Sequence, residues 1–313
     1  MELSEDATRS IVAHLAHLRA EYGEVLEKPD LVEPNGDYFP DEFALEPKGI
    51  ERLMRRMMTY APLASDLDVQ LGFVEPDDEA KAGGACGSGA CAPGDKSKSV
   101  IMSGAVETDD GYGVVLATAD VGEPKILTAS LARAMGRLVL FEAEEDVDPR
   151  DEGALSELTA VACGLGVILL NGASVYKKGC GGVRQHQGTF LGVQELGLAC
   201  ALFVRATDGK PGAVRRHLAV TQREAFDVAL DWVDGQPKLV RALTKDPASL
   251  ADGIFTIEEK KGLLSRLLTR KRDDDMPDAA SPISVKPRER SEEERRRIAE
   301  TRALVEEIGR AHV

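Results

Sequence analysis

The stretch Leu131–Glu142, LARAMGRLVLFE, combines the apolar spacing of a core helix with two arginines, Arg133 and Arg137, four residues apart. Residues at this spacing share one face of an α-helix, and Gly136 lies close to the same face. Like charges four residues apart repel each other slightly. The pair therefore indicates either a solvated edge of an amphipathic helix or the remnant of a functional site.

The composition is that of a globular protein with one or two domains, because 43% of the 313 residues are hydrophobic. The chain has 54 acidic and 39 basic residues, a formal net charge of -15 that repels phosphate and argues against general nucleic-acid binding. The first residues, MELSEDATRS, lack the pattern of a secretory signal, and no apolar run reaches the length of a membrane span. We therefore expect a cytoplasmic protein.

Apolar residues at helical spacing predict most of the secondary structure. The expected helices cover about 5–22, 47–60, 124–142, 152–170, 192–205, 221–231 and 239–243. His14 and His17 share the first helix, and without a third ligand they are expected to be partly exposed structural residues. Gly164 and Gly166 interrupt an apolar run, which predicts a buried helix with a close backbone approach.

Short β-prone segments predict a small sheet. The expected strands are Val69–Val74, Ser99–Val106 and Gly113–Ala119, and a turn at Asp109–Gly111 joins the last two as a hairpin. This strand element is expected to pack on the helix at 125–142. The predicted fold class is therefore α+β, a mostly helical domain with a small β-sheet.

Three marks occur in a fixed order along the chain. The first is DYFPDEF at Asp37–Phe43, and the third is ELTAVACGLGVILLNG at Glu157–Gly172. Between them, LARAMGR at Leu131–Arg137 matches the register of an L-A-H-E-L-G-H helix. Together the marks resemble a family of uncharacterised bacterial proteins of the zincin-like metallopeptidase type. The resemblance covers about residues 10–245 and implies a zincin-like fold.

The zinc-binding and catalytic residues of that family's central helix are replaced in this chain. In an H-E-x-x-H helix, two imidazoles bind zinc and the glutamate activates a water molecule. Here Arg133 and Arg137 stand at the two histidine positions, and Ala134 stands at that of the glutamate. Arginine offers no lone pair and alanine accepts no proton, which excludes zinc hydrolysis at this helix. Of the zinc ligands that the resemblance implies, only the third, Glu157, is present in this chain. In this degenerate site, Glu157 would become the ion-pair partner of the two arginines.

The cysteines form a second candidate site. Cys163 and Cys200 stand in apolar helical surroundings and are expected to be buried. The other cysteines and a nearby histidine lie in two Gly-rich segments: Cys86, Cys91, Cys180 and His186. Three interpretations stay open for them: incidental residues of a flexible loop, a metal site of the Cys₃His type holding zinc or iron, and a redox-active disulfide.

Composition and the resemblance together divide the chain into five parts. They are an N-terminal helical part at 1–75, a flexible Gly/Cys loop at 76–99, a zincin-like helical core at 100–255, a linker at 256–290 and a C-terminal helix at 291–313. The linker is recognised by its charge runs and prolines. The last segment opens with Ser291 and acidic residues, as a tethered helix would. We expect it to dock on a partner protein.

These observations favour a non-catalytic pseudoenzyme without a cofactor, acting as a protein-binding, assembly or regulatory scaffold. Two alternatives stay open. One is a metal or redox protein built on Cys86, Cys91 and Cys180. The other is a structural component of a larger complex, docked through the segment after Lys260.

Overall fold

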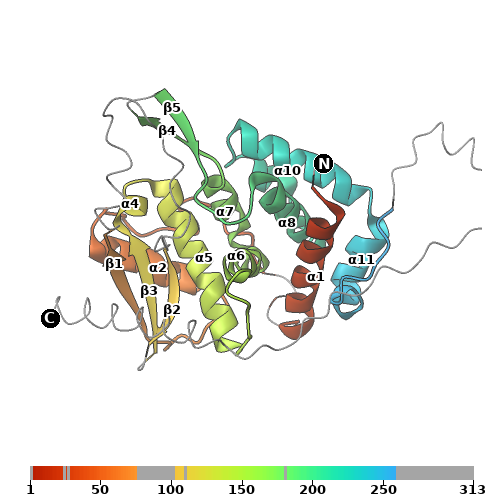
Figure 1. Ribbon diagram of the computed structural model, residues 1–313, viewed down its shortest axis with the longest axis horizontal. Helices are drawn as coiled ribbons and strands as arrows, with labels where there is room; N and C mark the ends of the chain where they lie inside the picture. The colour runs from red at the N-terminus through yellow and green to blue at the C-terminus, as the bar shows by residue number, and fades with distance from the viewer. Residues whose placement is uncertain are drawn as a thin grey trace, which may run out of the picture.

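The computed structural model describes residues 3–23, 26, 29–75, 103–108, 111–179 and 182–258, with the side chains of 177–185 excepted (Figure 1). This part of the chain is mostly helical with a small mixed sheet, which confirms the predicted α+β class. The longer helices are α1 (Glu5–Glu21), α2 (Pro47–Met58), α5 (Pro124–Glu142), α6 (Glu152–Ala160), α7 (Gly166–Gly172), α8 (Val193–Ala206), α10 (Val220–Asp234) and α11 (Pro237–Lys245). Short helices α4 (Thr118–Val121) and α9 (Pro211–Arg215) lie between them.

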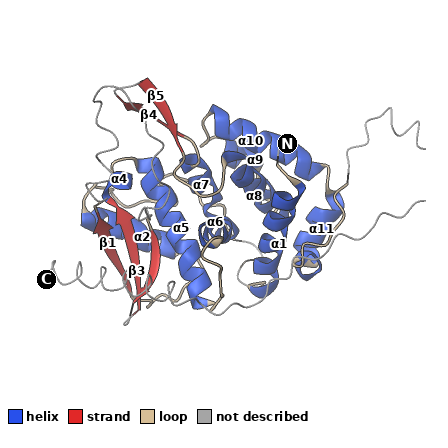
Figure 2. Cartoon of the chain, in the orientation of Figure 1, coloured by secondary structure: helices blue, strands red, loops and turns tan. Residues whose placement is uncertain are grey.

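The strands form one sheet and one separate hairpin. The sheet has the order β1-β3-β2, from β1 (Val69–Val74), β2 (Gly104–Thr108) and β3 (Gly111–Ala117). Strands β2 and β3 are antiparallel, as predicted, while β1 runs parallel to β3. The hairpin of β4 (Val175–Gly179) and β5 (Gly182–His186) extends away from the body of the molecule (Figure 2). Sequence analysis did not predict this hairpin.

Helix α5 occupies the middle of the molecule (Figure 2). The sheet packs on it from one side, as expected, and α6 and α7 pack on it from another. Gly136 sets the distance to α6, because a Cβ atom at this position would lie 1.9 Å from the carbonyl oxygen of Ser156. Only a glycine allows the two helix backbones to approach so closely.

Helices α6 and α7 belong to one apolar run, Glu152–Gly172, and a π-helical turn at Val161–Leu165 joins them. Gly164 has a φ of 91° and a ψ of 0° inside this turn, which is not a helical conformation, so the run is kinked at a glycine that the sequence analysis expected to interrupt it. By length and composition alone the run could cross a membrane, which corrects the expectation that no run is long enough. In the fold, 83% of its most apolar window is buried.

The close approach expected at Gly164 is confirmed. The amide of Val32 donates a hydrogen bond of 3.0 Å to the Gly164 carbonyl, and a Cβ atom at Gly164 would lie 2.0 Å from the carbonyl oxygen of Asp30. This contact fixes the segment between α1 and α2 against the turn that joins α6 and α7.

One continuous core joins the described residues on both sides of the Gly/Cys segment. Its members include Leu15 of α1, Met54 of α2, Leu116 of β3, Met135 of α5, Leu202 of α8 and Phe226 of α10. Cys163 and Cys200 belong to this core as free thiols, as predicted, and burial raises the pKa of each to about 12.

Candidate functional site

Arg133 lies inside the fold, at the point where α5 meets α6. Only 4% of its side chain is exposed. Its Nη1 atom donates to Glu157 Oε1 at 3.2 Å and to the Gly188 carbonyl at 3.2 Å, and its Nη2 atom donates to the Ser103 carbonyl at 2.7 Å. The guanidinium group therefore links α5 to α6, to the start of β2 and to the loop that precedes α8.

Glu157 of α6 is fully buried, with 0% of its side chain exposed. Besides Arg133, two backbone amides donate to it: Phe190 N to Oε1 at 2.8 Å and Leu191 N to Oε2 at 2.9 Å. Burial raises the pKa of the Glu157 carboxyl, and the Arg133 charge and the two amides oppose that rise. We call Arg133, Glu157 and the backbone groups that they bind the Arg133 cluster.

The cluster is closed toward solvent by an aromatic ring. The guanidinium carbon of Arg133 lies 5.2 Å from the centre of the Phe190 ring, within the range of a cation–π contact. The same ring packs beside Gly153, where a Cβ atom would lie 2.4 Å from the ring atoms. Within the described part of the chain, the Phe190 ring covers the Arg133 guanidinium group, and the side chains of Arg133 and Glu157 are 4% and 0% exposed.

Arg137 has different partners from Arg133. It forms an ion pair with Glu152 at 3.1 Å, and its guanidinium carbon lies 4.1 Å from the centre of the Phe141 ring. Its ion-pair partner Glu152 precedes Glu157 along α6. Helices α5 and α6 run in opposite directions, so a residue one turn further along α5 meets an earlier residue of α6.

The alternative interpretation, in which Arg133 and Arg137 form a solvated edge of an amphipathic helix, is wrong. The Arg133 side chain is 4% exposed and that of Arg137 is 11% exposed. Ala134, between the two arginines, is fully buried in the apolar core. The local chemistry is that of a buried ion pair joined to hydrogen bonds.

Most of the cysteine site lies outside the described residues. This holds for Cys86, Cys91 and Cys180, while His186 is exposed at the end of β5. Within the described ranges, no three His, Cys, Asp or Glu side chains converge as metal ligands. The zinc, iron and disulfide interpretations therefore stay predictions.

The paired histidines of α1 have structural contacts, as expected. His14 Nε2 lies 3.2 Å from the Thr159 hydroxyl, and His17 Nε2 lies 2.9 Å from Glu145 Oε1. Both residues are partly exposed. Burial, helped by the charge of His17, lowers the pKa of His14 to about 4.

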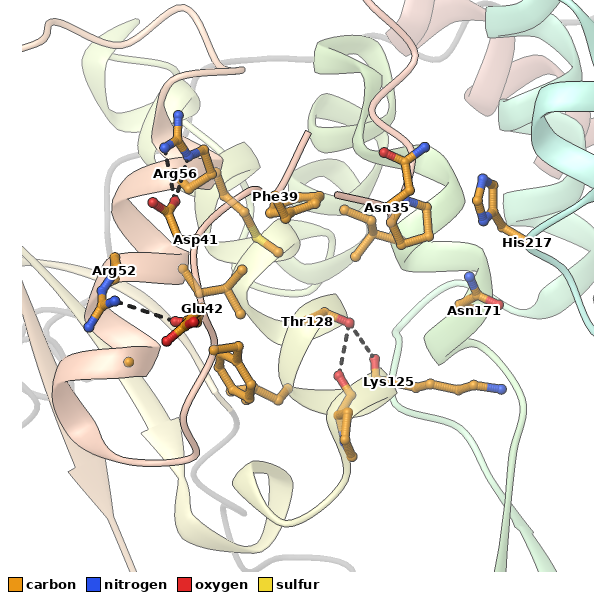
Figure 3. Close-up of a pocket in the computed structure, with 18 residues that line it drawn as sticks. Asn35, Phe39, Asp41, Glu42, Arg52, Arg56, Lys125, Thr128, Asn171 and His217 are labelled. Atoms are coloured by element: carbon orange, nitrogen blue, oxygen red, sulfur yellow. Dashed lines mark hydrogen bonds and ion pairs between the residues drawn. The ribbon is translucent and has the colours of Figure 1, made fainter. Parts of the chain in front are cut away.

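A cavity of about 420 Å³ is a second candidate site, and sequence analysis missed it (Figure 3). It lies between the loop 34–43, helix α2, the first turn of α5 and the end of α7. Tyr60 holds the loop in place, because its hydroxyl donates to the Tyr38 carbonyl and its ring contacts those of Tyr38 and Phe39 edge to face. The DYFPDEF segment could have pointed to the cavity, since residues of this segment form one of its walls.

We compared the chain with profiles of known protein families, with curated protein sequences and with solved structures, and none of them matched. The zincin-like relationship therefore stays a hypothesis. The Arg133 cluster and the cavity are interpreted from their own geometry.

Proposed function

We propose that this protein is a non-catalytic, zincin-like pseudoenzyme that acts by binding. The observation that carries the proposal is the buried Arg133–Glu157 ion pair, which joins two of the positions that the resemblance aligns with metal ligands. A fold can keep its stability while the residues of its site change, because burial maintains the fold and individual side chains carry the chemistry.

The contacts of the pair support a structural role. A guanidinium group offers no lone pair, so Arg133 cannot serve as a proton acceptor or a metal ligand. Both oxygens of Glu157 already accept hydrogen bonds from groups of the fold. A general base or a ligand needs a free lone pair that faces the substrate, and the buried Glu157 carboxylate offers none toward solvent.

Restoring the metal ligands tests the zincin-like relationship. The variant Arg133→His/Ala134→Glu/Arg137→His would carry two imidazoles on one face of α5 with Glu157 across from them. It is best made in a Cys86→Ser/Cys91→Ser/Cys180→Ser background, so that thiolates do not bind the metal. We expect about one zinc ion per chain by elemental analysis.

The matched control is Arg133→Gln/Ala134→Glu/Arg137→Gln in the same background, which removes both charges without adding imidazoles. It should bind no zinc. A folded His-Glu-His variant without zinc would contradict the zincin-like relationship. Metal-dependent peptide hydrolysis by the unaltered chain would contradict the non-catalytic role if Glu157→Gln abolished it.

We further propose that the bound partner is a protein and that segment 291–313 is the docking arm. The segment lies outside the described residues, and its sequence, with Ile298, Leu304 and Ile308 at helical spacing, supports the proposal. Deleting residues from Asp273 onward should remove co-purifying proteins while leaving the unfolding midpoint of the remaining chain unchanged. Identical partners in the full and shortened chains would contradict a docking role.

A further inference from the structure

The cavity beside α5 has the size and the walls of a small-molecule site (Figure 3). Its volume of about 420 Å³ is within the range of ligand pockets. Leu53 and Met57 of α2, Leu127 of α5 and Ile168 of α7 line it. Met57, Leu127 and Ile168 belong to the buried core, and Leu53 packs against that core. These walls are therefore apolar and held in place by the packing of the fold.

Two aromatic residues of the loop 34–43 complete the apolar lining. Phe39 and Phe43 both line the cavity, and Phe43 is 49% exposed. A ligand in the cavity would remove part of this aromatic surface from water, which favours binding. The lining therefore favours a molecule that is itself mostly apolar.

The charged residues of the lining need no counter-charge from a ligand. Arg56 forms an ion pair with Asp41 at 2.9 Å, and His217 Nε2 lies 2.7 Å from Glu33 Oε2. The other charged residues of the lining are exposed and keep their hydration: Glu42, Arg52 and Lys125. A charged ligand would therefore lose hydration in the cavity without gaining a buried counter-ion.

The uncharged polar atoms of the lining offer little to a polar ligand. The Thr128 hydroxyl donates to the Pro124 carbonyl at 2.9 Å, and the Asn35 Oδ1 atom accepts from the Asp37 amide at 2.9 Å. The Asn171 Oδ1 atom is buried and out of reach of a ligand. Apolar contact is thus the main interaction that the cavity provides.

We propose that this cavity binds one compact, uncharged and mostly apolar molecule between α2, α5, α7 and the loop 34–43. Burial against the apolar walls favours such a molecule, and the cost of desolvation disfavours an ion. This site goes beyond the proposed protein binding. It does not depend on the Arg133 cluster, since the cavity lies along a different part of α5.

Calorimetric titration of the full-length protein with three molecules of matched shape tests the proposal. They are naphthol, which is uncharged at neutral pH, naphthoate, and the naphthylmethylammonium ion. Aromatic probes are suitable because phenylalanine and methionine side chains form favourable contacts with aromatic rings. We expect one naphthol per chain, and both ions should bind at least about tenfold more weakly. Equal or tighter binding of either ion would overturn the uncharged class of ligand, and absence of naphthol binding would overturn the site.

A matched pair of threonine variants locates the ligand. Thr128 and Thr244 are both partly exposed helical residues whose hydroxyl donates to the carbonyl four residues earlier, but of the two only Thr128 lines the cavity. Thr128→Trp should weaken naphthol binding at least about tenfold because the indole fills the cavity, whereas Thr244→Trp should leave it unchanged. Equal affinity of the two variants would overturn the assigned position.

A second pair decides the question if Thr128→Trp does not fold. Phe43→Ala should weaken naphthol binding about tenfold, because it removes an aromatic wall at a half-exposed position where the fold depends little on the ring. Leu45→Ala is the control, since Leu45 is 55% exposed two residues further along and does not line the cavity. Equal affinity of Phe43→Ala and Leu45→Ala would overturn the proposal.

Discussion

Two cations on helix α5 show how differently one element can use the same kind of charge. Arg133 is buried and donates to a carboxylate and two backbone carbonyls. Lys125, two turns earlier, is exposed at a cavity and has no ion-pair partner in the described part of the chain. The Arg133 cluster is closed and holds the fold together, while Lys125 stands at an open cavity.

The energetics of the two positions differ for a physical reason. A buried charge has lost its hydration, so removal of its partner leaves an uncompensated charge in a medium of low dielectric. An exposed charge keeps its hydration, and its replacement changes the free energy of unfolding little. The following predictions, in order of decreasing effect, test this contrast.

The largest effect is expected from breaking the buried ion pair. Glu157→Gln or Arg133→Met should each lower the free energy of unfolding by about 3 to 5 kcal/mol, because the remaining partner stays buried. Urea titration followed by circular dichroism measures the change. The double variant should lose clearly less than the sum of the two single losses. Strict additivity, or single losses below about 1 kcal/mol, would show that the pair is not coupled.

The helix contact that creates the cluster can be broken at Gly136. Gly136→Ala should lower the free energy of unfolding by about 3 kcal/mol, because its Cβ atom would collide with the Ser156 carbonyl and force α5 and α6 apart. Gly122→Ala is the matched control, since no atom lies within 4 Å of a Cβ atom there. The same urea titration should show no loss for the control. Equal stability of the two variants would contradict the close approach.

The pH dependence of stability provides a smaller and independent effect, at the α1 face of α6. The pKa of His14 is lowered from 6.5 to about 4, so the unfolded chain takes up a proton at a higher pH than the folded chain. This contribution to stability is complete above pH 6.5 and declines as the pH falls toward 4. Allowing for the partial exposure of His14, we expect a decline of about 2 kcal/mol.

The variant His14→Gln tests this pH dependence. It should remove most of the change in unfolding free energy between about pH 7 and about pH 5, measured by urea titration at each pH. The single variant His17→Gln shows how much of the change depends on the neighbouring imidazole. An unchanged pH dependence in His14→Gln would assign the decline to other groups; Glu157 is not one of them, because a raised carboxyl pKa makes the fold more stable as the pH falls.

The smallest effect on stability is expected from replacing Lys125, the exposed cation of α5. Lys125→Met should change the free energy of unfolding by less than about 0.5 kcal/mol, because its exposed ammonium has no ion-pair partner in the described residues. Arg133→Met is its matched counterpart on the same helix. Similar losses of stability in the two variants would remove the distinction between a buried structural cation and an exposed one.

The helices and the sheet were largely predictable, and the reason is local. Apolar residues at a spacing of three and four placed α1, α2, α5, α8 and α10 close to their observed bounds. The hairpin β4–β5 was missed because its segments, VYKKG and GVRQH, are polar and carry no alternating apolar pattern. The kink between α6 and α7 was signalled by Gly164, whose φ of 91° favours a glycine.

The candidate sites were less predictable than the elements. The spacing of Arg133 and Arg137 suggested a shared carboxylate, but the opposite directions of α5 and α6 give each arginine its own partner. Asn171 closes an apolar helix in the sequence and gives no sign that its Oδ1 atom is buried without a hydrogen-bond partner among the described residues. Such a feature arises only where segments distant in sequence meet.

The sequence by itself determined the α+β class, the main helices, the burial of Cys163 and Cys200, and the lack of any zinc-binding side chain in the stretch Leu131–Arg137. These follow from local periodicity and from which side chains have lone pairs. Only the tertiary structure decided that Arg133 is buried while Lys125 faces a cavity. Burial and partner choice depend on which helices pack together, and that packing is set by close contacts such as Gly136 against Ser156.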